Sequence, residues 1–174
     1  MKLNKLQKKI GISFKDDKLL IQALTHKSFD TKNNYEKLEF LGDRVLGFVI
    51  SKKLLELYPN EKVGMIDKKL ANLVNKNKCF EIGKELELDN YILTGNTEKK
   101  KKVNIEKKII SDCCESLIGA IYIDKGFEVS SKFILNYWKN YLNLSDITVI
   151  DSKTRLQEYS LKKFKTLPIY KLIS

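Results

Sequence analysis

The stretch Ile109–Asp124 reads IISDCCESLIGAIYID and predicts a buried helix. Before its final residue, its only charged residues are Asp112 and Glu115, which share one helical face because they are three apart. Burying an unpaired carboxylate costs on the order of several kcal/mol, so such groups are normally paired or bound to a metal. No Lys or Arg of this stretch lies near enough to pair with them, and Gly119 continues the same face and permits another helix to approach closely.

A second acidic helix is expected from about Tyr35 to Leu57, before Pro59. At 3.6 residues per turn, Glu36, Glu39 and Asp43 fall within an arc of about 60°. Acidic stripes on helices are usually solvated faces, but this one continues into Leu46 and Ile50, and apolar residues occupy nearly every other direction. The pattern therefore predicts a largely buried helix with acids gathered at one end of one face.

Two helices that each offer acids one turn apart can together supply oxygen ligands to a hard cation such as Mg²⁺. Such a site activates water, stabilises a leaving oxygen and neutralises phosphate charge. His26 is the only histidine, and no nucleophile–base pair stands out elsewhere. The residues thus favour metal-assisted hydrolysis at Glu39, Asp43, Asp112 and Glu115, with a structural buried ion-pair network as the alternative.

Length and composition set the class of protein. The 174 residues suit one domain with a short appendage, and 43% hydrophobic residues are enough for a core. The longest apolar stretch contains Glu115 and is too short to span a bilayer, and the N-terminus MKLNKLQKKIGI lacks the apolar core of a signal peptide. We therefore expect a soluble, cytoplasmic protein without a membrane partner.

The net charge bears on the partner of the protein, and the cysteines bear on its chemistry. The formal net charge of +11 suggests a polyanionic partner, although a lysine-rich genome bias explains it equally well. The three cysteines form no metal-binding or disulfide pattern, and the adjacent Cys113 and Cys114 are expected to pack as small hydrophobes.

Helical periodicity dominates the remainder of the chain, so an all-α fold is expected. Asn33 or Asn34 is a candidate cap for the second acidic helix. A polar loop with four consecutive lysines, Lys99–Lys102, is expected over Thr94–Glu106. The expected helices cover residues 3–10, 16–24, 35–57, 66–75, 79–86 and 108–124, and a last amphipathic helix carries Phe127, Ile134, Tyr137, Trp138 and Tyr141 on one side.

The composition changes near residues 144–150, which are expected to form a linker. Beyond it, DSKTRLQEYSLKKF (Asp151–Phe164) predicts one more short helix, and LPIYKLIS (Leu167–Ser174) predicts a single strand. One strand cannot satisfy its own hydrogen-bonding ladder, so this tail looks like the start of a larger unit.

Three segments resemble the ribonuclease III family. They are NYEKLEFLGDRVLG (Asn34–Gly47), IISDCCESLIGAIYIDKG (Ile109–Gly126) and ALTHKSF (Ala23–Phe29), in the family's order and at plausible separations. The tail resembles the opening helix and first strand of a double-stranded-RNA-binding domain. The resemblance implies an all-α ribonuclease III-type endonuclease domain over residues 1–145, a linker over residues 146–150 and a truncated α/β RNA-binding domain over residues 151–174.

The resemblance also implies roles for individual residues. Glu39, Asp112 and Glu115 match the family's magnesium ligands, and Asp43 matches the acid that works with Glu115 in catalysis. Further matches are assigned by position alone: Glu36 and Glu98 as accessory acids, for which plain exposed charge is the alternative, Phe40 as a dimer contact, and His26 and Ser28 as hydrogen-bonded structural residues.

Two departures from the family pattern stand out. Val63–Gly64 occupies a place where the family commonly has an acid before a glycine, and Glu61 lies two residues earlier. The second departure is the RNA-binding segment, which stops at Ser174, far short of the roughly 65–70 residues that such a module needs to bury a core. The sequence leaves open whether this truncation is natural or artificial.

The implied activity is hydrolysis of double-stranded RNA by a homodimer with Mg²⁺, for which Mn²⁺ is the expected substitute, and with no organic cofactor. Products would carry 5′-phosphates, 3′-hydroxyls and short 3′ overhangs, and the expected substrates are precursors of ribosomal RNA and structured messenger and transfer RNA precursors. One alternative is a non-catalytic duplex-RNA-binding or ribosome-assembly protein on the same fold, although such relatives would be expected to lose the four acids. Another is a compact relative without an RNA-binding domain, against which the DSKTRLQEY segment speaks.

Overall fold

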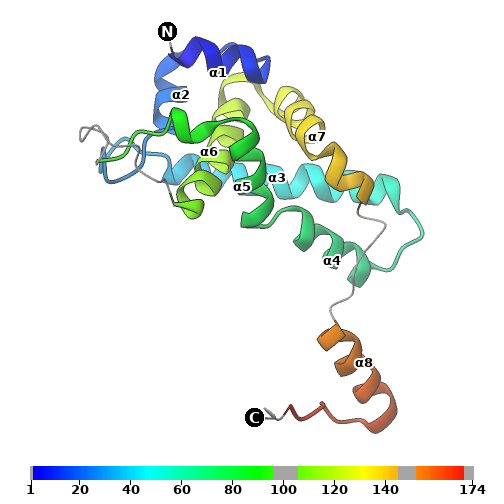
Figure 1. Cartoon of the computed structure of the whole chain (residues 1–174). Coiled ribbons are helices and arrows are strands. Elements are labelled where there is room, and N and C mark those ends of the chain that lie inside the picture. Colours follow the sequence, from blue (N-terminus) through cyan, green and yellow to red (C-terminus); the bar gives the residue numbers. More distant parts are fainter. Residues whose placement is uncertain (1, 96–105, 145–151, 171–174) are drawn as a thin grey trace.

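The computed structural model describes residues 2–95, 106–144 and 152–170 (Figure 1). Within these ranges the chain is helical, and its only β-type pairing is an isolated bridge between Thr25 and Leu93. The expected all-α class is therefore confirmed. The helices are α1 (Lys2–Ile10), α2 (Asp17–Ala23), α3 (Glu36–Leu57), α4 (Val63–Leu73), α5 (Lys76–Glu85), the 3₁₀ turn η1 (Leu88–Asn90), α6 (Lys107–Lys125), α7 (Phe127–Leu144) and α8 (Ser152–Phe164).

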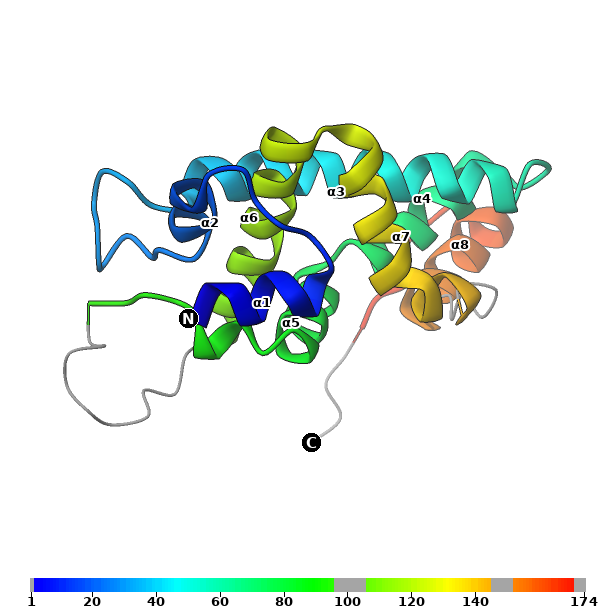
Figure 2. The same ribbon diagram turned by 90° about the horizontal axis from the view of Figure 1, so that it is seen from above.

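Helix α6 forms the centre of the fold. Every residue from Ile110 to Ile121 is buried, including its two acids, so the helix is enclosed on all sides. Helices α3 and α5 pack against it from different sides, and α2 and α7 complete the enclosure (Figures 1 and 2). The buried helix predicted from this stretch is confirmed, and its C-cap is Gly126, with a positive φ of 79° that favours glycine.

Two glycines bring α3 and α6 into backbone contact. A Cβ atom placed on Gly42 would overlap the carbonyl group of Glu115, and one placed on Gly119 would overlap the carbonyl of Leu38. The absence of both Cβ atoms therefore allows the two helices to cross at their backbones. This crossing lies next to the acidic residues of both helices, so it determines how closely those acids can approach one another.

Helix starts differ from the predicted ones where the first turn is polar. Helices α4 and α5 each begin three residues before the expected positions 66 and 79. Asn75 caps α5 by accepting a hydrogen bond from the backbone nitrogen of Lys78. Apolar periodicity cannot detect such a polar first turn. For α3 the N-cap is Tyr35, not Asn33 or Asn34, although the Asn34 side chain accepts a hydrogen bond from Glu36 N.

Helix α7 presents the expected apolar face to the core. Ile134 and Trp138 are fully buried, and the indole nitrogen of Trp138 donates a 2.8 Å hydrogen bond to the Leu73 carbonyl. Tyr137 and Tyr141 are half-buried beside them. Within the described ranges, none of the helices combines the length and apolar character needed to cross a lipid bilayer.

The tail agrees with the prediction in part. Helix α8 is confirmed, and the expected linker at residues 146–150 lies outside the described residues, as does most of the predicted polar loop. The strand predicted from Leu167 is wrong for residues 167–170, which belong to no strand, while residues 171–174 lie outside the described part. The physical reason is that a strand needs a neighbouring strand to pair its backbone N–H and C=O groups.

Candidate metal centre

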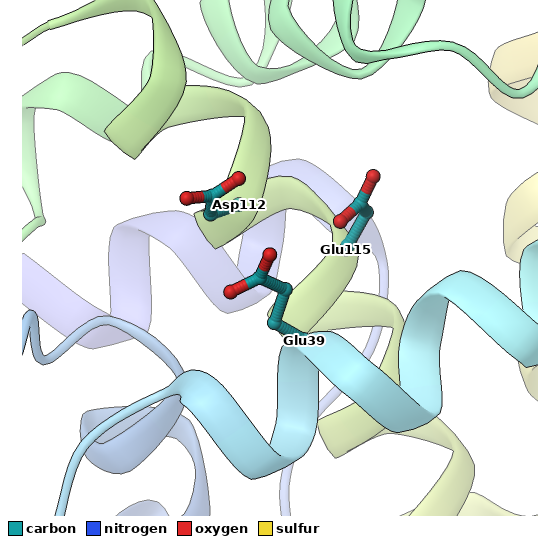
Figure 3. A group of neighbouring side chains, drawn as sticks. All are labelled: Glu39, Asp112 and Glu115. Carbon is teal, nitrogen blue, oxygen red and sulfur yellow. The ribbon is translucent and has the colours of Figure 1, made fainter.

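Three of the predicted acids converge where α3 crosses α6. Glu39 projects from α3, and Asp112 and Glu115 project from α6, so that one carboxylate oxygen of each lies within 4.8 Å of the others (Figure 3). Asp112 and Glu115 are 4% and 2% exposed, and Glu39 is half-buried. Because each acid comes from a rigid helix, the three carboxylates are held together by the fold rather than by a loop. We call these residues the acidic triad.

The triad lies at an open pocket of about 680 Å³ where α3 and α6 cross, and Lys76 of α5 and the segment between α2 and α3 also line this pocket. The pocket has a mixed charge, because acids from both helices face several cationic side chains on its wall. Its basic lining residues are Lys27, Arg44, Lys76 and Lys108. Such a pocket can hold a cation at its acids while its lysines and arginine face an anionic ligand.

Asp43 lines the same pocket but lies outside the triad. Its carboxylate is partly exposed and forms a 2.5 Å ion pair with Arg44, whose guanidinium group also lies 4.2 Å from the centre of the Phe40 ring. Asp43 is one helical turn beyond Glu39 and close enough to raise the pKa of Glu115 through its negative charge.

The acidic triad has a cationic partner that sequence reasoning missed. The ammonium group of Lys76 lies 3.0 Å from Glu39 Oε1, 2.6 Å from Asp112 Oδ1 and 2.7 Å from Glu115 Oε2. Lys76 is the first residue of α5, which packs against α6. Because the lysine precedes Asp112 by 36 residues, no local pattern connects the two. The buried ion-pair network that the sequence left open as an alternative is therefore present.

Burial disfavours the charged forms of Glu115 and Lys76, whereas the contacts between Lys76 and the carboxylates favour them. Burial raises the pKa of Glu115 above 4.5, the contact with Lys76 partly offsets it, and the charges of Asp43 and Glu39 raise it further. For Lys76, burial alone would lower the pKa, but its hydrogen bonds to Asp112, Glu115 and Glu39 hold the pKa well above 10.5. The ammonium group is thus charged, and the negative charges of the carboxylates around it still repel one another.

The donor set of the triad suits a hard divalent cation. Carboxylate oxygens are the protein ligands that Mg²⁺ prefers, and Mg²⁺ is commonly held by one or two carboxylates together with waters. Glu39, Asp112 and Glu115 offer three such groups within 4.8 Å of one another. The Lys76 ammonium group already contacts the same three residues, which shows that this position favours positive charge.

The accessory acids are less closely connected to the triad. Glu36 lines the pocket but is exposed and pairs with Lys27 at 3.1 Å. Glu98 lies outside the described residues. Glu61 lies in the turn after α3 and does not line this pocket, while Val63 is the exposed first residue of α4. Besides the acids of α3 and α6, the pocket is lined by Glu106, the residue before α6, and by neither Val63 nor Glu61.

The segment between α2 and α3 is fixed by hydrogen bonds. His26 N donates to the Leu93 carbonyl at 2.9 Å, and His26 Nδ1 lies 2.8 Å from Ser28 Oγ, which also accepts from Gly95 N. His26 and Ser28 therefore have the structural hydrogen bonds expected of them. This network anchors one wall of the pocket, where His26 and Tyr35 also contribute.

Comparisons with known proteins agree with this geometry. The family described as Ribonuclease-III-like matches residues 16–142. Ribonuclease 3 of Pelagibacter ubique (strain HTCC1062) is 62% identical over 100% of this chain and 79% of its own length, and Ribonuclease 3 of Hahella chejuensis (strain KCTC 2396) is 43% identical over 99% and 77%.

Solved structures lead to the same family. A nuclease domain of ribonuclease III from Campylobacter jejuni, described for structural flexibility in a region involved in dimer formation, superposes with a TM-score of 0.74. It is 37% identical, over 80% of this chain and 97% of that domain. The dicer of Pichia stipitis, with a TM-score of 0.60 and 19% identity, shares the fold. The family match over residues 16–142 and the 62% identity to the Pelagibacter ubique protein over the full length of this chain establish that this chain belongs to the ribonuclease III family.

Proposed function

We propose that this chain is a magnesium-dependent endoribonuclease that hydrolyses double-stranded RNA. Family membership supports the class of enzyme, an endoribonuclease that breaks phosphodiester bonds. The observation that carries the proposal is the acidic triad at a pocket lined by cationic side chains. This combination matches a phosphodiester substrate, whose negative charge repels acids unless a cation lies between them.

Glu39, Asp112 and Glu115 are proposed to hold Mg²⁺, with Mn²⁺ as a substitute. The bound cation would supply activation of water, stabilisation of the leaving oxygen and neutralisation of phosphate charge. The burial of Asp112 and Glu115 supports this role. The attraction between a carboxylate and a cation is stronger in a buried, low-dielectric site than in water.

Asp43 is proposed to act on the attacking water together with Glu115. Its partly exposed carboxylate lines the pocket and can accept a hydrogen bond from that water, while Arg44 holds it in place. The water oxygen bonds to phosphorus as the water gives up one proton, and the bond from phosphorus to the 3′ oxygen breaks. The 3′ oxygen takes up one proton, so the products carry a 5′-phosphate and a 3′-hydroxyl.

Duplex RNA is proposed to be recognised by its shape, its phosphates and its 2′-hydroxyls rather than by base sequence. The formal net charge of +11 and the basic residues at the pocket support binding of a polyanion. Ribosomal RNA precursors and structured messenger and transfer RNA precursors are the proposed substrates. The three free cysteine thiols agree with the cytoplasm as the proposed compartment.

A homodimer is proposed as the working form, with one catalytic centre in each subunit, so that paired cuts leave short 3′ overhangs. Large apolar side chains are exposed along one side of α3, at Phe40, Phe48 and Leu55. At 100° per residue these three lie within an arc of about 80°. Exposed apolar residues in one stripe are typical of an interaction surface. The dimer formation mentioned for the Campylobacter jejuni nuclease domain supports the same conclusion.

The tail is proposed to begin an RNA-binding domain at residue 151, after a catalytic domain over residues 1–145. Helix α8 supports this assignment, because its apolar residues Leu156, Tyr159 and Phe164 are exposed. A helix of this kind needs a further layer to cover it.

Incubation of a perfectly paired RNA duplex with the purified protein tests the proposal directly. With Mg²⁺, the wild type should cut both strands and leave 5′-phosphates, and EDTA should stop the reaction. Glu115→Ala should lower the rate about a hundredfold or more. Glu56→Ala is the matched control, because Glu56 on α3 pairs only with surface Lys53 in the described structure. A folded Glu115→Ala protein that cuts as well as the wild type would sink the proposal.

A further inference from the structure

The position of Lys76 has a consequence for metal binding. Its ammonium group contacts one oxygen of each member of the acidic triad, at 2.6–3.0 Å. These three residues are also the ones whose geometry suits a divalent cation. We propose that Lys76 is a tethered competitor of the metal, which neutralises the triad from α5 and must move out when a divalent cation binds. This inference rests on the proposed metal-binding role of the triad.

Charge explains why the ionised triad needs a cation. Asp112 and Glu115 are almost completely buried, and Glu39 brings a third carboxylate within 4.8 Å of them. Three such groups repel one another strongly in a low-dielectric site unless positive charge lies between them. Lys76 supplies one positive charge, whereas a divalent cation supplies two and binds carboxylate oxygens directly.

The side chain of Lys76 is able to move away from the acidic triad into solvent. It is 52% exposed, although two of its three partners are buried, so its stem already lies along the open side of the pocket. A lysine has a flexible four-carbon stem and a strongly hydrated ammonium group, and both lower the cost of moving it into solvent. The acids, by contrast, are attached to two helices that are locked at the Gly42–Gly119 crossing. Exchange of cations therefore requires movement of the lysine and not of the triad.

Two of the other basic residues that line the pocket have different partners. Arg44 pairs with Asp43, and Lys27 pairs with Glu36. In residues 2–95, 106–144 and 152–170, Lys76 is the cation with ion pairs to all three triad carboxylates. Competition is reciprocal: the metal weakens the binding of Lys76 to the triad by the same factor as Lys76 weakens the binding of the metal. Removing the charge at position 76 must therefore raise the affinity of the triad for metal.

Titration of EDTA-treated protein with Mn²⁺, followed by the electron paramagnetic resonance of the free ion, tests this inference. Lys76→Gln should bind Mn²⁺ about 5- to 150-fold more tightly than the wild type, the usual range for coupling between two ligands. Lys84→Gln is the matched control on the same helix, since Lys84 pairs with Asp89 outside the site, and it should bind like the wild type. A lysine that merely supports the fold would give the opposite result, because its loss would weaken Mn²⁺ binding.

The outcomes separate this inference from the proposed function. Equal or weaker Mn²⁺ affinity in Lys76→Gln, with the wild type still binding, overturns the role of Lys76 and leaves the metal site intact. Failure of the wild type and both variants to bind Mn²⁺ overturns both proposals.

A measurement on the wild type covers the case in which Lys76→Gln does not fold. Acetylation by a water-soluble amine reagent, read out by mass spectrometry, should modify Lys76 several times faster after Mn²⁺ is added, while modification of Lys84 stays constant. Unchanged acetylation of Lys76 at saturating Mn²⁺ would show that the lysine does not leave the triad.

Discussion

At the residue scale, Glu115 is the side chain in which burial and charge conflict most directly. It is 2% exposed, and it lies near two other acids that raise its pKa, while Lys76 compensates only in part. An acid in this setting destabilises the folded protein when it is ionised and no stronger cation is present. Proteins often retain such groups at functional sites, where a ligand supplies the missing charge.

This conflict predicts the pH dependence of stability of the EDTA-treated protein. A raised pKa means that the folded protein holds the Glu115 proton more tightly than the unfolded chain does. The resulting stability is fully present below pH 4.5, the ordinary pKa, and is lost as the pH rises through the folded-state pKa. Glu115→Gln remains neutral, so the wild type should lose stability relative to this variant as the pH rises from 4.5 towards 7.

Urea unfolding at fixed protein concentration measures the difference. Glu56→Gln should follow the wild type across the range, because an exposed ion pair such as Glu56–Lys53 contributes little to stability. If the wild type instead gains stability over Glu115→Gln as the pH rises, the raised pKa is wrong.

How far the sequence revealed this site depends on where each residue lies along the chain. Asp112 and Glu115 stand out because a single apolar stretch contains both. Lys76 could not be predicted, since it reaches the triad from another helix across 36 to 39 residues of sequence. Its place depends on the Asn75 cap and on the packing of α5 against α6, which are properties of the folded chain.

At the scale of elements, the crossing of α3 and α6 positions the triad. Gly42 and Gly119 face each other there, with the backbone of one helix in contact with that of the other. The role of Gly119 in close approach was apparent from its place on the acidic face. Its partner Gly42 could be recognised only once the crossing point was known, because Gly47 on the same helix has open space beside it.

Substitution of these glycines should separate packing from helix propensity. Gly42→Ala and Gly119→Ala should each lower the free energy of unfolding by about 3 kcal/mol or more, because the added methyl group meets backbone that cannot rotate away. Gly47→Ala should stabilise the protein by about 0.5–1 kcal/mol, since alanine favours the helix and meets nothing. Thermal and urea unfolding measure both effects. Equal effects at positions 42 and 47 would rule out the close crossing.

The ends of elements were harder to predict than their existence. The long helices α3 and α6 were predicted within a residue or two, because apolar periodicity extends over most of their length. The first turns of α4 and α5 were missed because they are polar, and the strand predicted at Leu167 failed because it has no partner.

At the scale of the whole molecule, the apolar stripe on α3 bears on assembly. Phe40 is 63% exposed and Phe48 is 61% exposed, on the same helix that carries Glu39 and Asp43. A dimer formed through this stripe would couple assembly to the pocket that contains the acidic triad, because Phe40 and Arg44 line that pocket.

Phe40→Ala should therefore weaken the proposed homodimer. In a two-fold symmetric interface each substitution acts twice, so the dissociation constant should rise by roughly a hundredfold or more. Sedimentation velocity over a concentration series gives this constant. Ile21→Ala on α2 removes another exposed apolar side chain and is the control that should leave it unchanged. A dimer of undiminished strength in Phe40→Ala would place the interface elsewhere.

The central claim is that Glu39, Asp112 and Glu115 together hold the catalytic metal. Anomalous diffraction from crystals soaked in Mn²⁺ tests it most directly, because the signal locates the ion without assumptions about activity. We expect a strong peak among the three carboxylates, with the Lys76 ammonium group withdrawn from them. A peak elsewhere, or none at the triad while Lys76 still contacts all three acids, would contradict the account.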